Sequence, residues 1–309
     1  MTVTCDEFLA SVKRLVTVPA SQSLLEDSDI LALATDIQRD TLTPMIMSVD
    51  EEYFIMKSVP TPIVVGQTSY RIPSRAVARK LREIKIVNEG GIVSDFPKIN
   101  IERTQVYRSS SVPFGFHFLG DRVELVPSPA TTGYSLLFYW PGQPGKFVKL
   151  QEAAVVTNIS GDDVTLDALP ATYVANTRMD FIEGVSGNWY LGLSALVTNV
   201  AGNTLTFETG TVPTDLAVGD YIALTGQSPV LQIPDEGAPL LQTLTAYDVL
   251  GTISDFEGQQ RLEPKIKLQK ENFLKVISPR IDGEPNIIIN DRGLLRGRIR
   301  RNWAGLYRG

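Results

Sequence analysis

An internal repeat constrains the fold of this chain more than any other feature of its sequence. Within residues 150–235, the stretch 156–166 aligns without gaps on 197–207, and 180–182 resembles 220–222 further along. Each copy alternates apolar and polar residues on both sides of a Gly-Asp or Gly-Asn pair, which is typical of two strands joined by a tight hairpin turn. Because one hairpin cannot bury its apolar face alone, we expect the two copies to close on each other as one small β-barrel.

Before the repeat, the sequence shows first the periodicity of helices and then that of strands. Apolar residues at three-and-four spacing predict helices near 28–40 and 44–57, with Thr43 capping a restart at Pro44. From residue 59 the period changes to that of strands, which we expect at 63–65, 70–73, 81–87, 123–126 and 134–140. This part of the chain therefore predicts helices together with a small sheet.

Helical periodicity returns after the repeat. Residues 240–250 carry an apolar stripe, and Pro264 predicts the start of a second helix that ends near Ser278. The simplest topology is an α+β fold in three parts. These are a helix-and-sheet base from residues 1–149 plus 236–280, a β-barrel inserted at 150–235, and an extended basic C-terminal arm at 281–309.

Composition excludes several classes of enzyme. Among 309 residues, Cys5 is the only cysteine and His117 the only histidine. An internal disulfide, a thiolate zinc site and a metal centre with two or three histidines are therefore excluded. The sequence also lacks a phosphate-binding Gly-rich loop and a dinucleotide-binding motif. We predict no enzymatic activity, no cofactor and no metal.

The remaining reactive or acidic groups have simple structural interpretations. His117 lies in the apolar stretch 114–118, which favours a structural histidine over a general base. Cys5 is interpreted as an incidental thiol in a mobile first segment. The acidic runs 50–52 and 162–163 are interpreted as a solvated helix face and a hairpin turn, rather than as a carboxylate pair or a calcium site.

The aromatic run Phe138-Tyr139-Trp140 is open to two interpretations. It could stack on a sugar or a nucleic-acid base. In a strand, however, Phe138 and Trp140 share one face while Tyr139 points to the other, which favours packing in a core covered by helices.

Charge is unevenly distributed along the chain. Residues 292–309 contain six arginines and no acid and so carry +6; since the whole chain carries −6, residues 1–291 carry −12. The arginines alternate with Leu, Ile, Trp and Tyr, and Arg, Trp and Tyr dominate binding hot spots. We predict an arm that an acidic protein surface or a nucleic acid orders, with candidate residues Arg292, Arg296, Arg298, Arg300, Arg301, Trp303, Tyr307 and Arg308.

No membrane association is expected. The apolar runs are far shorter than the roughly 20 residues that a bilayer span requires. The first residues have neither a basic region nor an apolar core, so they do not read as a secretory signal.

Eight short blocks, in a defined order, span most of the chain: residues 28–34, 51–54, 70–76, 81–84, 218–222, 226–229, 232–236 and 278–285. Together with the inserted repeat, they resemble the head-to-tail adaptor (connector) proteins of short-tailed bacteriophages. The resemblance implies a virion component at the head-tail junction that assembles in the host cytoplasm.

The resemblance further implies a closed homo-oligomeric ring, a dodecamer, beneath the portal protein. Such a ring extends the DNA channel, lets genomic DNA pass without specific binding, and carries the tail nozzle or tail tube protein. It also implies that residues 292–309 bind the portal. The residues themselves fit this role, because a ring needs two unlike faces rather than catalytic groups, and an acidic body repels DNA.

Two other functions are weighed against the adaptor. A carbohydrate- or receptor-binding phage tail module would use the β-barrel, with Trp189 and Tyr190 as exposed aromatics. A hydrolase would have to be built on His117 or a carboxylate pair, and no supporting motif accompanies either.

Overall fold

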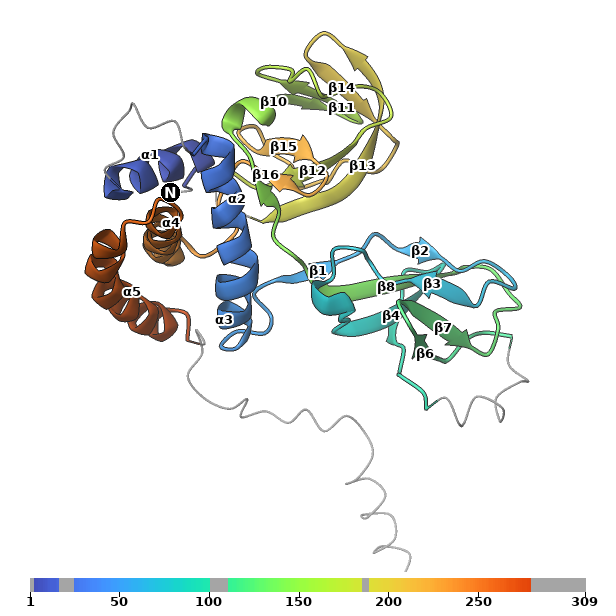
Figure 1. The fold of residues 1–309 in the computed structure, drawn as a ribbon. Helices are drawn as coiled ribbons and strands as arrows, with labels where there is room; N and C mark the ends of the chain where they lie inside the picture. Colours follow the sequence, from blue (N-terminus) through green and yellow to red (C-terminus); the bar gives the residue numbers. More distant parts are fainter. Residues whose placement is uncertain (1–2, 17–24, 101–110, 185–188, 279–309) are drawn as a thin grey trace, which may run out of the picture. The chain divides into compact units, whose positions relative to one another are not determined.

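The computed structural model describes residues 3–16, 25–100, 111–184 and 189–278 of the chain (Figure 1). It is a mixed α+β structure with helices and several sheets, which confirms the predicted fold class at that level. The chain divides into a compact unit, residues 1–278, and a second unit, residues 279–309. The predicted arm and all of its candidate residues therefore lie outside the described residues.

Segments from the two ends of the compact unit form one helical core. The helices are α1 (Cys5–Val16), α2 (Asp27–Ile37), the π-helical η1 (Gln38–Leu42), α3 (Thr43–Met47), α4 (Ala238–Thr252) and α5 (Phe256–Val276). Helix α4 packs against α1, α2 and α5. Phe8, Leu42, Leu241 and Phe273 are among the buried residues of this core. Burial of apolar side chains thus joins helices more than 200 residues apart in sequence.

Helix α1 corrects the expectation of a mobile first segment. Cys5 begins this helix and is fully buried, and its N–H donates to the carbonyl of Pro229 at 2.8 Å. Burial also raises the pKa of the Cys5 thiol.

The expected restart at Pro44 is confirmed, since α3 begins at Thr43 with Pro44 in its first turn, but the expected gap before it and its expected end near residue 57 are wrong. Residues 27–47 form consecutive helical segments, and the chain then turns into a strand at Ile55 instead of staying helical to residue 57. Proline lacks an N–H, and its ring clashes with the carbonyl four residues earlier. The wider π-helical turn η1 accommodates this, because the N–H of Thr43 donates to the carbonyl of Gln38, five residues back.

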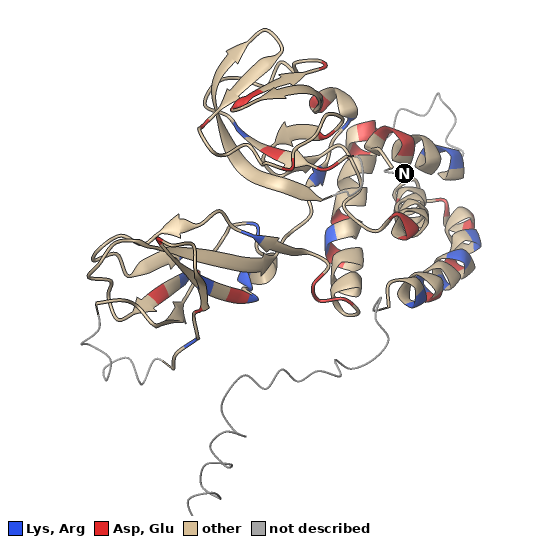
Figure 2. Cartoon of the chain, turned by 180° about the vertical axis from the view of Figure 1, so that it is seen from behind, with Lys and Arg blue, Asp and Glu red and all other residues tan. Residues whose placement is uncertain are grey.

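The expected break at Pro264 is also wrong. The chain interrupts its helices between α4 and α5, where the Asp255 side chain caps α5 by accepting the N–H of Gly258 at 2.9 Å. Pro264 lies inside α5 on its exposed side, where water can solvate the carbonyl that loses its partner. Only Gly258 and Phe273 of α5 are buried, and Lys, Arg and Glu residues occur along the length of the helix (Figure 2).

Two small sheets lie between α3 and the repeat. One has the order β1-β8-β4-β5, with β2 also paired to β8, and the other has the order β3-β7-β6. The strands are β1 (Ile55–Lys57), β2 (Thr61–Pro62), β3 (Ser69–Arg71), β4 (Glu83–Asn88), β5 (Val93–Asp95), β6 (Gly115–Leu119), β7 (Arg122–Val126) and β8 (Tyr134–Pro141). Phe138 and Trp140 are both buried, which confirms that they pack in a core, but residues of strands and loops rather than helices form that core.

The repeat forms a closed ring of six antiparallel strands in the order β10-β11-β14-β13-β12-β15. Its strands are β10 (Ala154–Ser160), β11 (Asp163–Leu166), β12 (Arg178–Ile182), β13 (Tyr190–Ala201), β14 (Thr204–Phe207) and β15 (Tyr221–Leu224). The two predicted hairpin turns are confirmed, with Gly161 at φ +63° and Gly202 at φ +59°. Glycine suits both positions because it has no Cβ to strain this left-handed backbone.

Two short strands flank the ring in sequence. β9 (Lys146–Phe147) precedes it and β16 (Gln227–Ser228) follows it, and the two pair in parallel. All six ring strands fall within the predicted insert 150–235, while the division into base, insert and arm stays a prediction.

Candidate functional site

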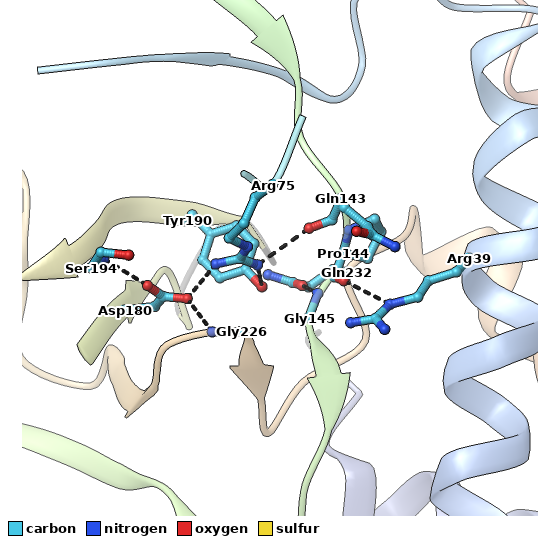
Figure 3. Close-up of polar contacts among 10 residues, drawn as sticks. All are labelled: Arg39, Arg75, Gln143, Pro144, Gly145, Asp180, Tyr190, Ser194, Gly226 and Gln232. Atoms are coloured by element: carbon cyan, nitrogen blue, oxygen red, sulfur yellow. Dashed lines mark hydrogen bonds and ion pairs between the residues drawn. The ribbon is translucent and has the colours of Figure 1, made fainter. Parts of the chain in front are cut away.

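A largely buried arginine, whose side chain is 15% exposed, joins the sheets to the six-strand ring. Arg75, in the loop between β3 and the 3₁₀ turn η2 (Val77–Arg79), forms an ion pair with Asp180 of β12 and donates to the hydroxyl of Tyr190 in β13 (Figure 3). It also donates to the carbonyl of Gln143 at 3.2 Å. Its guanidinium carbon lies 4.2 Å from the centre of the Tyr190 ring. The planar fork of arginine is therefore engaged both at its edges and on its face.

Asp180 is fully buried, so its charge depends on the groups around it. Besides Arg75, it accepts the N–H groups of Ser194 and Gly226, each at 2.8 Å. Burial raises the pKa of the Asp180 carboxyl above its usual value, while Arg75 and the two N–H donors oppose that rise. The carboxylate is thus held by groups that lie 14, 46 and 105 residues away in sequence.

The repeat contains a matching aspartate that serves as an internal comparison. Asp220 corresponds to Asp180 in the second copy and is 1% exposed. Its oxygens accept the N–H groups of Gly184, at 2.9 Å, and Ala217, at 2.8 Å, both within the 154–224 region that contains the ring. Asp220 therefore stabilises the ring locally, whereas Asp180 also binds a cation from outside it.

The contacts continue from Arg75 toward the helices through residues 143–145. The N–H of Gly145 donates to the Gln232 side chain at 2.6 Å, and Arg39 of η1 donates to the carbonyl of Pro144 at 3.1 Å (Figure 3). A Cβ on Gly145 would lie 2.5 Å from the Tyr190 hydroxyl, so this close approach requires glycine. We call the group Arg75, Asp180, Tyr190 and Gly145 the arginine junction.

The arginine junction is suited to fixing orientation. A buried carboxylate without its cation is costly, so rotation of the ring away from the sheets would expose or unpair Asp180. Tyr190 is 7% exposed, and burial raises the pKa of its hydroxyl to about 12, so it stays a neutral hydrogen-bonding group at ordinary pH.

The histidine and the acidic residues that the sequence singled out as possible reactive groups are not part of the arginine junction. His117 lies in β6, and its Nε2 is 3.1 Å from a carboxylate oxygen of Glu124 on the paired strand β7. Asp162 lies in a hairpin turn and accepts the N–H of Gly210 at 3.2 Å. Across the described ranges, no group of three His, Cys, Asp or Glu side chains is placed to hold a metal ion.

The acidic run 50–52 is a turn rather than a helix face. Glu51 and Glu52 form ion pairs with Arg82 at 3.3 and 3.2 Å. All three side chains are at least half exposed, so these pairs contribute little to stability.

The expectation that Trp189 and Tyr190 are exposed aromatics is wrong. Tyr190 is buried beneath Arg75, and Trp189 is half-buried with its ring 5.2 Å from that of Phe54. Both pack between parts of the chain and do not form an open stacking platform.

Sequence reasoning missed Arg75 and Asp180 as functional residues, although both lie in stretches that it singled out. Asp180 precedes Phe181 and Ile182 in the second half of the first repeat, and an aspartate at an inward-facing position of an apolar strand signals a buried partner. The identity of that partner is not a local property, since Arg75 is 105 residues away.

None of the described helices combines the length and the apolar character needed to cross a bilayer. A scan against protein-family models and a search of curated proteins both found no match to this chain.

Proposed function

We propose that this chain is a virion structural protein, a head-to-tail adaptor that forms a homo-oligomeric ring below a phage portal. In this role it extends the DNA channel and provides the attachment platform for the tail. We also propose the finer organisation that goes with it. The six-strand ring is a small inserted β-barrel, residues 1–149 plus 236–280 form the base, and residues 281–309 form an extended arm in which residues 292–309 bind the portal.

The observation that supports the proposal most is the arginine junction. In a closed ring, every copy repeats the same head-to-tail interface, which in a dodecamer turns by about 30° per copy. An error in the angle between two parts of each copy therefore accumulates around the ring. A buried ion pair that joins the sheets to the inserted strands limits that error.

The charge distribution supports different roles for the acidic body and the basic arm. Residues 1–291 carry −12, which disfavours binding to DNA phosphates and suits a channel wall, while residues 292–309 carry +6. The proposed arm thus has the charge to hold an acidic surface of the portal.

Mass measurement and electron microscopy of the full chain, alone and with portal protein, test the proposal. We expect a closed ring, free or on the portal. A chain that remains monomeric under both conditions refutes it.

A matched pair of variants tests the arm. Replacing Arg298, Arg300 and Arg301 with Glu should abolish portal binding. The same charge change at Lys265, Lys267 and Lys270, on the exposed helix α5, should leave binding intact. Equal loss of binding in both variants would show that net charge alone, and not the arm, determines the interaction.

A further inference from the structure

A groove of about 510 Å³ lies between the sheets and the six-strand ring. Two continuous stretches, residues 55–59 and 189–194, line it together with 73–75 and Trp140. Successive side chains of a strand point to opposite faces. Since every residue of both stretches lines the groove, it runs along the strand edges rather than over a face. We call it the edge groove.

The backbone of β1 has an open edge toward the edge groove. β1 is the outermost strand of its sheet. The N–H of Gly142 donates to the carbonyl of Phe54, and the N–H of Ser58 donates to the carbonyl of Phe138. Hydrogen-bonded positions alternate along an antiparallel strand, so residues 54, 56 and 58 face β8. The N–H and C=O of Lys57 therefore face the groove.

The opposite wall has a similar opening. β13 pairs with β14 only from Val197 onward, so residues 190–195 pair with β12 alone within the described part of the chain. On the first wall, the stretch that follows β1 carries Pro60 and Pro62, which cannot donate a hydrogen bond. The edge groove thus has an unpaired strand edge on each wall, an arrangement that suits the addition of an extended segment.

Two buried donors in the groove lining lack an acceptor. The indole N–H groups of Trp140 and Trp189 are buried and have no hydrogen-bond partner among the described residues. Because both nitrogens are closed off from solvent, they belong to the wall of the groove and are not presented to an occupant.

The charge of the groove lining favours an acidic occupant. Its charged residues are Lys57 and Arg75, with no acid among the lining residues that the structure describes. Arg75 is paired with Asp180, whereas Lys57 is exposed and has no ion-pair partner in the described ranges.

We propose that residues 281–291 of a neighbouring copy bind in the edge groove, with residues 287–291 as the added strand. This segment, which lies outside the described residues, contains Asp282, Glu284 and Asp291, no cation, and the run Ile287-Ile288-Ile289. β-branched residues are strong strand formers, and the acids complement Lys57. The eight residues 279–286, which precede the strand, can extend over roughly 25–30 Å. The inference rests on the proposed function only in requiring that copies assemble side by side.

Disulfide cross-linking in the full chain tests the proposal directly. The double variant Lys57→Cys with Ile288→Cys should give a ladder of linked oligomers under oxidising conditions, whereas each single variant should give dimers at most. Native Cys5 does not interfere, because it is buried. Ile288→Cys combined with Lys267→Cys, on the exposed face of α5, is the matched control and should give no ladder. A link formed within one copy, or no link at all, overturns the proposal.

A fluorescent synthetic peptide of residues 281–291 tests recognition without assembly. Lys57→Glu in the full chain should weaken its binding about ten-fold, and Lys267→Glu should leave binding unchanged. A peptide with Ile288→Pro should not bind, because it cannot complete the strand hydrogen bonds. Equal binding of the two peptides, or no binding of either, contradicts strand addition.

The two proposals fail in different ways. A closed ring that shows no Lys57–Ile288 link removes the groove inference and leaves the adaptor function standing. A cross-linked ladder in a chain that never closes into a ring or binds portal supports the groove inference and removes the adaptor function.

Discussion

Replacing Arg75 with Ala should destabilise the protein strongly at neutral pH and much less in mild acid. The substitution leaves the fully buried Asp180 carboxylate with only its two backbone N–H donors. Removing one partner of a buried ion pair typically costs about 3–5 kcal/mol.

The protein can limit this cost by protonating Asp180. From the ordinary aspartate pKa of 3.8, holding a proton at about pH 7 costs about 4 kcal/mol, at about 1.4 kcal/mol per pH unit. At about pH 5, keeping Asp180 protonated costs only about 2 kcal/mol, and this is the largest destabilisation expected there. Burial raises the pKa of the Asp180 carboxyl in the folded state above its unfolded-state value. Folding stability is therefore highest below the unfolded-state pKa and declines as pH rises through the folded-state pKa. We therefore expect losses of about 3–4 kcal/mol near pH 7 and about 2 kcal/mol near pH 5.

Urea unfolding of four proteins at both pH values measures these losses. Besides the parent and Arg75→Ala, the set contains Asp180→Asn and the double variant. An asparagine side chain has one acceptor oxygen, so it can replace only one of the two carboxylate oxygens that accept from Ser194 and Gly226. Because it carries no charge, loss of Arg75 should cost only about 1–2 kcal/mol in the Asp180→Asn background. Equal destabilisation at the two pH values, or an equal cost of Arg75→Ala in the parent and in the Asp180→Asn background, would refute the assignment of a buried charge pair.

Three further predictions concern single buried groups. Because burial raises the pKa of Tyr190 to about 12 from 10.0, this hydroxyl should lower folding stability by about 3 kcal/mol as pH rises from 10 to 12. Burial also raises the pKa values of Tyr173 and Cys5, so Tyr190→Phe should make the alkaline loss of stability about 3 kcal/mol smaller in urea titrations without abolishing it. Gln38 is fully buried with neither amide atom hydrogen-bonded to a described residue, so Gln38→Met should raise the free energy of unfolding by about 1–2 kcal/mol. Phe273→Ala should cost about 3–5 kcal/mol, because Phe273 is the one large buried side chain of α5, whereas Leu274→Ala, at a site 37% exposed, should change stability by about 0.5 kcal/mol or less in the same assay.

Proline shows where local sequence preferences and the structure diverge. The sequence predicts that Pro44 and Pro264 each interrupt a helix, since proline removes one backbone donor. At Pro44 a π-helical turn changes the hydrogen-bond register, and at Pro264 the affected carbonyl lies on an exposed face. Proline's local penalty is real, but packing of the flanking apolar residues against the helical core outweighs it.

The amino-acid sequence by itself determined the local features of this protein. The repeat, the turns at Gly161 and Gly202 and the burial of Phe138 and Trp140 on either side of the half-buried Tyr139 follow from steric preferences and from residues that lie close together in the chain. Tertiary structure decided what lies between the parts. The pairing of Arg75 with Asp180 and the burial of Tyr190 join residues more than 100 positions apart, and periodicity within one segment carries no information about which distant segment will cover it.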